Sequence, residues 1–429
     1  MQVGDLPRRA TSPGAGATDG DAAVEQAPAG AEVGSRYWSA WLGDAWRRLL
    51  RDGFIRPAPI TRAHLLTGLK AAVVPYLVSR GLVWAATIFG ARNLVAPTGL
   101  YSNLYPPPAL SPFFRWDADA YGYIAHHGYG LGTGGVAAEV IRVAWFPFYP
   151  LLIHLTGGSD WAMIIIPNVC FFAALALLHV VGARRLDADR AQLAVWLCAL
   201  GPAAMFFSYP YTESTFLLLT VGAFVLMESG HWLLAGVGGF AAAMTRAPGV
   251  LLAAALGAEG VLGRRRAAIV AVILPVAGLL TVSLIQWAQM GDPLGYIHAR
   301  SIWIGPPRNP LYLVGSFPKA FIEGDPFNSE AIGVPILLIF AAGAVWVALR
   351  MPASYGVFAI AQILLAAQQG LYLHIFSLVP RTISVIFPCY FAFATFLAPR
   401  RSLQLAWLLI SASILVVNAI MYGGWRFIG

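Results

Sequence analysis

Residues 269–287 read IVAVILPVAGLLTVSLIQW and decide the fold class. The run carries no charged residue, and its length is close to the ~20 residues that cross ~30 Å of hydrocarbon as a helix. A second run, 332–349, has the same character. The chain of 429 residues is 58% hydrophobic and 11% charged, whereas soluble domains carry about 25% charged residues. We therefore predict an all-α polytopic membrane protein, because the alternating ~10-residue segments of a β-barrel are absent.

Charges between the apolar segments give an orientation. If the N-terminus is cytoplasmic, the basic clusters at 184–185, 264–266 and 400–401 all fall on the cytoplasmic side, with most of the 28 Lys and Arg residues. The positive-inside rule favours this orientation. The eleven predicted apolar segments are roughly 70–94, 161–183, 191–209, 212–228, 232–246, 247–262, 267–289, 332–349, 354–374, 382–398 and 402–422.

One apolar run does not fit a simple count of spans. Residues 143–155 (VAWFPFYPLLIHL) are too few to cross the bilayer and contain two prolines. Counting them as a span would also move the later basic clusters to the outer side. We interpret the run as an interfacial or re-entrant helix within a large first outer loop, 95–160, and place a second outer loop at 290–331.

The ends of the chain differ in composition from the apolar part. Residues 1–34 are rich in Ala and Gly and poor in large apolar side chains, so we expect a disordered cytoplasmic N-terminus. Residues 35–69 form a basic cytoplasmic juxtamembrane segment, and 70–429 form the transmembrane domain. The net charge of +8 has a sufficient explanation in membrane topology, so we predict no nucleic-acid partner.

Short motifs follow one another along the chain in a recognisable order. In the first outer loop these are Trp116-Asp117-Ala118, Ile124-Ala125, Gly128-Tyr129 and Phe146–Pro150 (FPFYP). Later come Pro202–Phe216 (PAAMFFSYPYTESTF), Thr245–Gly249 (TRAPG), Gly291–His298 (GDPLGYIH) and Pro380-Arg381 with Phe387-Pro388. In order and spacing, over about residues 60 to 400, the chain resembles the PIG-V mannosyltransferases of the GT-C class.

The resemblance implies both a fold and a reaction. The fold would be a GT-C-like bundle of about 11 transmembrane helices, whose large first extracytoplasmic loop carries interfacial helices. The reaction would move mannose or a related sugar, with inversion, from a polyprenyl-phosphate donor to a hydroxyl of a glycolipid, glycan or protein. The protein would lie in the plasma membrane with its active site extracytoplasmic, and would need no cofactor beyond the lipid-linked donor. In this class the acidic residue of the first outer loop is the general base, and the matching residue is Asp117.

The residues around Asp117 also indicate a role for it independently of the resemblance. In a short helix from Asp117, Tyr121 lies on the same face as Asp117, while Asp119 points nearly opposite. A carboxylate suits the removal of a proton from an acceptor hydroxyl, since the phosphate leaves without protonation. The simpler interpretation of Asp117 is a helix N-cap or a salt bridge to Arg115.

Two further ionisable residues lie at boundaries of apolar segments. Glu213 follows Tyr211 and is costly there unless it pairs with a cation or faces a cavity, so it would orient the acceptor or pair with an arginine. Arg246 separates two short segments and suits a donor phosphate, although it could instead pair with Glu213 or Asp117, or extend to the headgroups. The full predicted set of substrate-binding residues is Arg115, Asp119, Tyr121, Tyr211, Glu213, Arg246, His298, Arg300 and Arg381.

The sequence gives less support to a metal site or a transporter. His126-His127 and His298 lack the spacing of a metal motif, so we predict no metal site. A polytopic transporter or lipid flippase is the alternative function, but transporters place ionisable groups near the midplane of two related halves. Here only Arg80 lies deep in a span, and the other charges collect near one face. This distribution favours an enzyme acting at the membrane surface.

Overall fold

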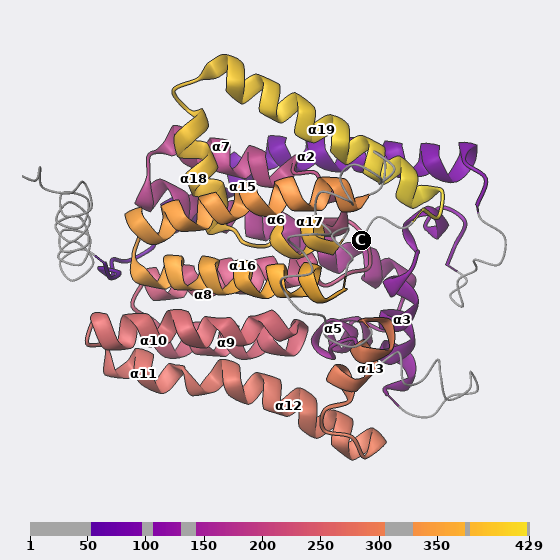
Figure 1. Ribbon diagram of the computed structural model, residues 1–429, viewed down its shortest axis with the longest axis horizontal. Helices are drawn as coiled ribbons and strands as arrows, with labels where there is room; N and C mark the ends of the chain where they lie inside the picture. The colour runs from indigo at the N-terminus through magenta and orange to yellow at the C-terminus, as the bar shows by residue number, and fades with distance from the viewer. Residues whose placement is uncertain (1–52, 97–105, 130–142, 305–328, 374–377, 427–429) are drawn as a thin grey trace, which may run out of the picture. The chain divides into compact units, whose positions relative to one another are not determined.

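The computed structural model describes residues 53–96, 106–129, 143–304, 329–373 and 378–426, which belong to one compact unit, Arg48–Gly429. Within these ranges every regular element is a helix (Figure 1). The predicted segment 1–34, and the part of 35–69 before residue 53, lie outside the described residues. In chain order the elements are α2 (Arg62–Asn93), η1 (Ser111–Phe113), α3 (Asp117–His127), α5 (Phe148–Leu155), α6 (Asp160–Arg185), α7 (Ala188–Ala199), η2 (Ala204–Phe207), α8 (Glu213–Glu228), α9 (Trp232–Thr245), η3 (Ala247–Leu251), α10 (Leu252–Leu262), α11 (Arg266–Ala271), α12 (Ile273–Met290), α13 (Gly295–Ile304), α15 (Ser329–Arg350), α16 (Ala353–Leu373), α17 (Leu378–Ile383), α18 (Pro388–Leu397) and α19 (Arg401–Gly423).

Several helices have the length and composition of membrane spans. Among the described residues, five stretches meet both criteria: Arg62–Asn93, Asp160–Arg185, Arg266–Met290, Gly333–Arg350 and Arg401–Gly423. Four other apolar helices have 10 to 17 residues. Helix α5, inside the predicted first loop, has 8 residues, which rise only ~12 Å. This length agrees with our interpretation of 143–155 as a segment that does not span.

Some predicted segments are interrupted in the structure. The segment 191–209 is helical only to Ala199, because Gly201 and Pro202 follow and a proline cannot continue the hydrogen-bonded ladder. The chain then turns through η2. The segment 382–398 likewise contains a break, after which α18 begins with Pro388 in its first turn. The break between 232–246 and 247–262 occurs at Arg246, as the sequence indicated. These interruptions leave short stretches of non-helical backbone between the helices.

The first and last of the described helices pack against each other through glycines. A Cβ atom on Gly90 of α2 would overlap the backbone of Ile420 in α19, and a Cβ atom on Gly423 would overlap the backbone of Thr87. Small residues allow helix backbones to approach this closely in membrane proteins. Figure 1 shows α19 alongside α2.

Helix α8 lies between α6 and α9, and its last residue anchors a buried charge cluster. Glu228 is 1% exposed and accepts hydrogen bonds from Arg185 Nε and the Tyr355 hydroxyl, each at 2.6 Å. Arg184 Nε lies 3.5 Å from the other carboxylate oxygen. The Glu228 carbonyl also accepts from the Ala58 N–H at 2.9 Å. We call these residues the Glu228 cluster. It ties the chain before α2 to the ends of α6, α8 and α16.

Candidate functional site

Helix α3 begins at Asp117 after an unusual backbone turn. Trp116, the N-cap, has φ 53° and ψ −113°, a conformation that a residue with a side chain rarely adopts. Its ring packs edge-on against Trp425, with ring centroids 5.8 Å apart. Strain of this kind persists only where the surroundings hold it, and it collects at functional sites. The turn fixes the direction in which the Asp117 carboxylate leaves the backbone.

A second carboxylate comes from the start of α8. Glu213 is the first residue of that helix and is fully buried, at 0% exposed. A negative charge is favoured at a helix N-terminus, where the unpaired backbone N–H groups carry a partial positive charge. The preceding loop is held from both sides: the Ser214 hydroxyl donates to the Phe207 carbonyl at 2.8 Å, and the Tyr211 hydroxyl donates to the Arg115 carbonyl at 3.0 Å.

Two arginines join these carboxylates. Arg381 of α17 bridges them: its Nη1 lies 2.7 Å from Asp117 Oδ2, and its Nε donates to Glu213 Oε1. Arg246, at the break between α9 and η3, donates from Nη1 to the same Glu213 oxygen. Four elements that are distant in the sequence therefore meet in one ionic network. We call Asp117, Glu213, Arg246 and Arg381 the Glu213 cluster.

Hydroxyl groups line the cluster. The Tyr121 hydroxyl lies 3.2 Å from Thr212 Oγ1, which also accepts from Arg246 Nη1 at 3.5 Å. Burial raises the pKa of the Tyr121 phenol, and the carboxylates of Asp117 and Glu213 raise it further. The phenol therefore stays protonated at neutral pH. Tyr121 contacts Thr212 beside the cluster and Asp117 contacts Arg381 within it, which agrees with the helical-face argument.

The cluster leaves specific atoms uncommitted. Among the described residues, Glu213 Oε2 is buried with no hydrogen-bond partner, and Asp117 Oδ1 makes no hydrogen bond. The Asp117 side chain is 21% exposed and that of Arg246 is 19% exposed. Within the same ranges, Arg246 uses only Nη1. A molecule entering here would meet a carboxylate oxygen and guanidinium N–H groups together.

Arg381 is also held by two aromatic rings. Its guanidinium carbon lies 4.9 Å from the ring centroid of Phe206 and 4.6 Å from that of Tyr211. Such contacts stabilise a cation most when water is excluded. Arg381 is therefore oriented from two sides, by the carboxylates and by the rings.

Arg115, a predicted substrate-binding residue, has a different place in the structure. Its Nη1 donates to the Phe114 carbonyl at 2.9 Å, and its Nη2 to the Gly423 carbonyl at 3.4 Å. Its guanidinium carbon lies 4.4 Å from the ring centroid of Trp425. The salt bridge to Asp117 considered as an alternative is not formed between these described residues, because Asp117 pairs with Arg381. The side chain of Arg115 thus connects the start of α3 to the end of α19.

The remaining predicted residues lie on α3 and α13. Asp119 lies on α3 two positions after Asp117 and is half-buried. His298 is exposed, and its Nδ1 lies 2.8 Å from Asp292 Oδ2. This hydrogen bond lowers the pKa of Asp292 below its usual value. The side chain of Arg300, and all of the segment 305–328 within the second predicted loop, lie outside the described part of the structure.

Three contributors were missed by the sequence analysis. Thr212 stood beside Glu213 in a quoted motif and could have been included as a hydroxyl next to an ion pair. Phe206 and Tyr422 gave no such signal. The Tyr422 hydroxyl, near the end of α19, lies 3.1 Å from the Phe113 carbonyl and 3.4 Å from the Arg115 carbonyl. Only the fold brings this side chain to the start of α3.

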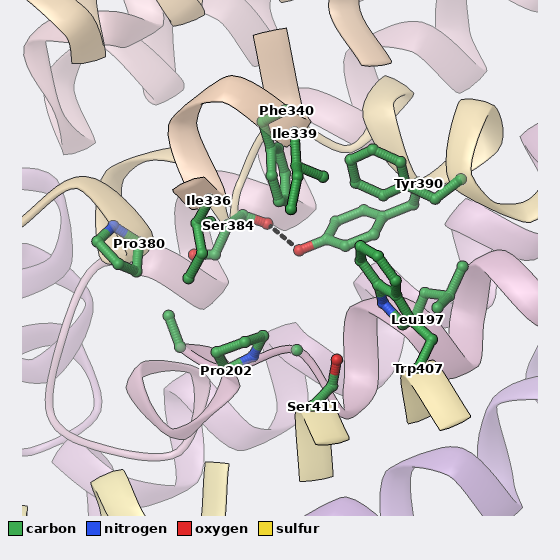
Figure 2. Close-up of a pocket in the computed structure, with 13 residues that line it drawn as sticks. Leu197, Pro202, Ile336, Ile339, Phe340, Pro380, Ser384, Tyr390, Trp407 and Ser411 are labelled. Carbon is green, nitrogen blue, oxygen red and sulfur yellow. Dashed lines mark hydrogen bonds between the residues drawn. The ribbon is translucent and has the colours of Figure 1, made fainter. Parts of the chain in front are cut away.

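An apolar pocket adjoins α17. Its cavity volume is about 60 Å³. Figure 2 shows Pro380 of α17 and Ser384, the residue that follows this helix, on one side, and Tyr390, whose hydroxyl donates to the Ser384 carbonyl at 2.8 Å. Pro380 immediately precedes Arg381. The lining residues are Leu197, Gly201, Pro202, Ala203, Ile336, Ile339, Phe340, Pro380, Ser384, Tyr390, Phe393, Trp407 and Ser411.

Metal-binding groups are not gathered in the described ranges. No set of three or more His, Cys, Asp or Glu side chains there has the arrangement to hold a metal ion. His154, one histidine of the first loop, lies with its Nδ1 3.0 Å from the Ala125 carbonyl.

Comparisons with known proteins add the following. No protein-family model matches the chain, and no curated protein matches it. The chain is similar to the solved structure of ArnT from Cupriavidus metallidurans bound to undecaprenyl phosphate, with a TM-score of 0.47 and 15% identity over 81% of this chain and 63% of that one. It is also similar to the archaeal oligosaccharyltransferase AglB from Archaeoglobus fulgidus in complex with an inhibitory peptide and a dolichol-phosphate, with a TM-score of 0.38 and 11% identity over 82% of this chain and 56% of that one. The chain therefore spans less than two thirds of the length of either protein.

Proposed function

We propose that this protein is a glycosyltransferase that moves a sugar from a polyprenyl-phosphate donor to a hydroxyl acceptor, with Asp117 as general base. The observation that carries the proposal is the Glu213 cluster: a partly exposed carboxylate stands beside two arginines held by a second, buried carboxylate. This arrangement places a proton acceptor next to groups that bind phosphate.

The donor phosphate is assigned to Arg246. Its Nη1 donates to Glu213 and Thr212. Within the described residues Nε and Nη2 make no hydrogen bond and could bind a ligand. Guanidinium groups bind phosphate oxygens through paired hydrogen bonds. The developing charge on the leaving phosphate would be stabilised by these groups without any movement of the backbone.

Asp117 is assigned to the acceptor. Arg381 holds Oδ2 and so orients the carboxylate, while Oδ1 remains available. The acceptor oxygen attacks the anomeric carbon, the bond from that carbon to the phosphate oxygen breaks, and the hydroxyl proton passes to Asp117. The polyprenyl phosphate leaves as an anion. Attack opposite the leaving group inverts the anomeric configuration.

The apolar pocket supports a lipid-linked donor. It is lined by α7, α15, α17, α18 and α19, and it lies beside the helix that carries Arg381. A prenyl chain is apolar and flexible, and its burial is favoured by roughly 25 cal/mol per Å². A phosphate at the cluster and a chain in the pocket would be neighbours along one molecule.

The finer assignments rest on sequence. Arg184 and Arg185 belong to the Glu228 cluster, at the opposite end of α8 from Glu213, and the positive-inside rule places that end in the cytoplasm. The Glu213 cluster would then face the extracytoplasmic side of the plasma membrane. The PIG-V-like motifs favour mannose as the sugar, and the lipid-linked donor would suffice without a metal or other cofactor.

The test is a transfer assay with purified protein in nanodiscs. Polyprenyl-phosphate carrying tritiated mannose is the donor, and a lipid extract of the host cell envelope supplies acceptors. General-base assistance contributes about 10²–10⁴-fold, so Asp117→Asn should lower kcat by about that factor and leave the KM for donor unchanged. Asp119→Asn is the matched control and should cost far less.

Two results would contradict the proposal. One is full activity of Asp117→Asn, which would show that Asp117 is not the general base. The other is activity abolished by EDTA and restored by a divalent cation, which would contradict metal independence. In sealed vesicles, movement of labelled donor across the bilayer without any transferred sugar would instead favour a flippase.

A further inference from the structure

Arg80 is a buried cation whose position the proposed reaction does not explain. It lies within α2, one of the helices long and apolar enough to span a membrane, and is 4% exposed. A charged side chain inside an apolar span is costly, and such residues are rare unless they have a function. In the described part of the chain, no acidic side chain forms an ion pair with it.

The charge of Arg80 is directed at one short loop. Its Nη1 donates to Ser208 Oγ at 2.7 Å and its Nη2 to the Ala204 carbonyl at 3.0 Å. The Phe171 ring lies against the guanidinium, with 4.5 Å between the carbon and the ring centroid. Asn168 holds the same loop, donating from Nδ2 to the Ser208 carbonyl at 2.9 Å. One buried cation thus fixes η2 and the residue after it.

This loop leads directly to the Glu213 cluster. After Ser208 the backbone runs without regular helix to Thr212, and Glu213 then begins α8. Phe207, within the fixed part, is stacked on Phe171 at 4.5 Å. Because the segment is short and not helical, its path is set by the side chains that hold it rather than by its own hydrogen bonds.

We propose that Arg80 is a positioning residue for glycosyl transfer: through Ser208 and Ala204 it holds the loop that places Thr212 and Glu213, and through them the two arginines of the site. This inference rests on the proposed function. An arginine suits the task and a lysine does not, because the planar guanidinium reaches two acceptors at fixed angles.

The first experiment separates positioning from binding. Kinetics are measured with the polyprenyl-phosphate-mannose donor for wild type, Arg80→Met and Arg80→Lys. A misplacement of about 1 Å can cost about 100-fold in rate, so kcat of Arg80→Met should fall by about that factor while the KM for donor stays within about threefold. Arg80→Lys keeps the charge but not the planar guanidinium, so its kcat should lie between those of wild type and Arg80→Met. Lys70→Met is the control, since it removes an exposed cation from the same helix.

A second experiment does not depend on the donor. Thr215 Oγ1 lies 3.8 Å from Cys170 Sγ, so Thr215→Cys places two thiols together across α6 and the start of α8. Copper phenanthroline should form this disulfide quickly in the wild-type background, and several-fold more slowly in the Arg80→Met background. If Arg80→Met does not fold, Asn168→Leu, which loosens the same loop, takes its place in both experiments.

The outcomes are distinct. A folded Arg80→Met with kcat within threefold of wild type, or with a change in KM alone, overturns the inference. An unchanged rate of disulfide formation also overturns it. A wild-type protein that transfers no sugar rejects the proposed function, and the disulfide rate then still decides whether Arg80 places the start of α8.

Discussion

The two ends of α8 carry the same chemistry arranged in opposite ways. The helix begins with Glu213 and ends with Glu228, 16 residues that rise ~24 Å, and both glutamates are fully buried. Each is paired with two arginines. Glu228 also accepts from a tyrosine, whereas one oxygen of Glu213 has no partner among the described residues.

The helix dipole makes this difference informative. A carboxylate is favoured at the N-terminus of a helix and disfavoured at its C-terminus. Glu213 thus occupies the easier position and is left incompletely bonded, while Glu228 occupies the harder one and is fully surrounded. The Glu228 cluster is organised to hold helices of the bundle together. The Glu213 cluster is organised to leave polar atoms available.

The strongest test of this contrast is Glu213→Gln. The amide keeps the shape of the side chain but removes the charge that holds Arg246 and Arg381. Because both arginines would lose their common anchor, we expect kcat for transfer to fall by about 100-fold. The fold should remain, as judged by gel filtration in detergent. A kcat within threefold of wild type would show that the cluster is only structural.

A smaller loss is expected from Arg246→Ala. Removing a charge-assisted hydrogen bond to phosphate costs roughly 1.5–3 kcal/mol, which corresponds to about ten- to a hundredfold weaker use of donor. The measurement is kcat/KM for the polyprenyl-phosphate sugar. Unchanged saturation by donor would mean that Arg246 serves Glu213 alone and binds no phosphate.

At the other end of α8, Glu228→Gln should affect stability and spare transfer. The variant leaves Arg184 and Arg185 without their carboxylate, and an unsatisfied buried group costs about 1–3 kcal/mol. We expect a lower midpoint of thermal unfolding, with kcat per folded molecule within about twofold of wild type. If kcat falls as it does in Glu213→Gln, the contrast between the two ends is wrong.

The smallest effect is expected at the exposed pair Asp292–His298. The pKa of Asp292 is lowered in the folded protein, so its contribution to stability is present above its unfolded pKa, near pH 4, and is lost as the pH falls through the lower folded value. Because the pair is exposed, that contribution is a few tenths of a kcal/mol. Unfolding midpoints of wild type and Asp292→Asn should therefore differ slightly at pH 6 and converge below pH 3. A constant difference at both pH values would count against this reading.

Sequence patterns predicted the local features well. Long uncharged runs identified the membrane helices, Arg246 indicated a break, and helical spacing placed Asp117 and Tyr121 on one face. All of these depend on residues close together in the chain. The breaks after Ala199 and before Pro388 were not predicted. The chemistry at Asp117 and the direction of the membrane topology stay predictions.

The contacts across the chain could not be predicted in the same way. Arg381 was predicted only as one member of the substrate-binding set, yet it is the residue that bridges both carboxylates, because α17 is carried beside α8 by the packing of later helices. Arg115 precedes Asp117 directly but turns to the end of α19. The sequence suggested a salt bridge between Arg115 and Asp117, but in the structure Asp117 pairs with the distant residue Arg381.

The glycine contact between α2 and α19 constrains how the protein is made. Of the described helices α2 is synthesised first and α19 last, and domains otherwise tend to fold as the chain emerges. The face of α2 that carries Gly90 therefore cannot make its final contact until α19 has been inserted. Tyr422 supports the backbone just before Asp117 only after the same event. Biogenesis thus completes the surroundings of Asp117 at the end, so a nascent chain that has not yet inserted α19 lacks the contacts that hold the start of α3.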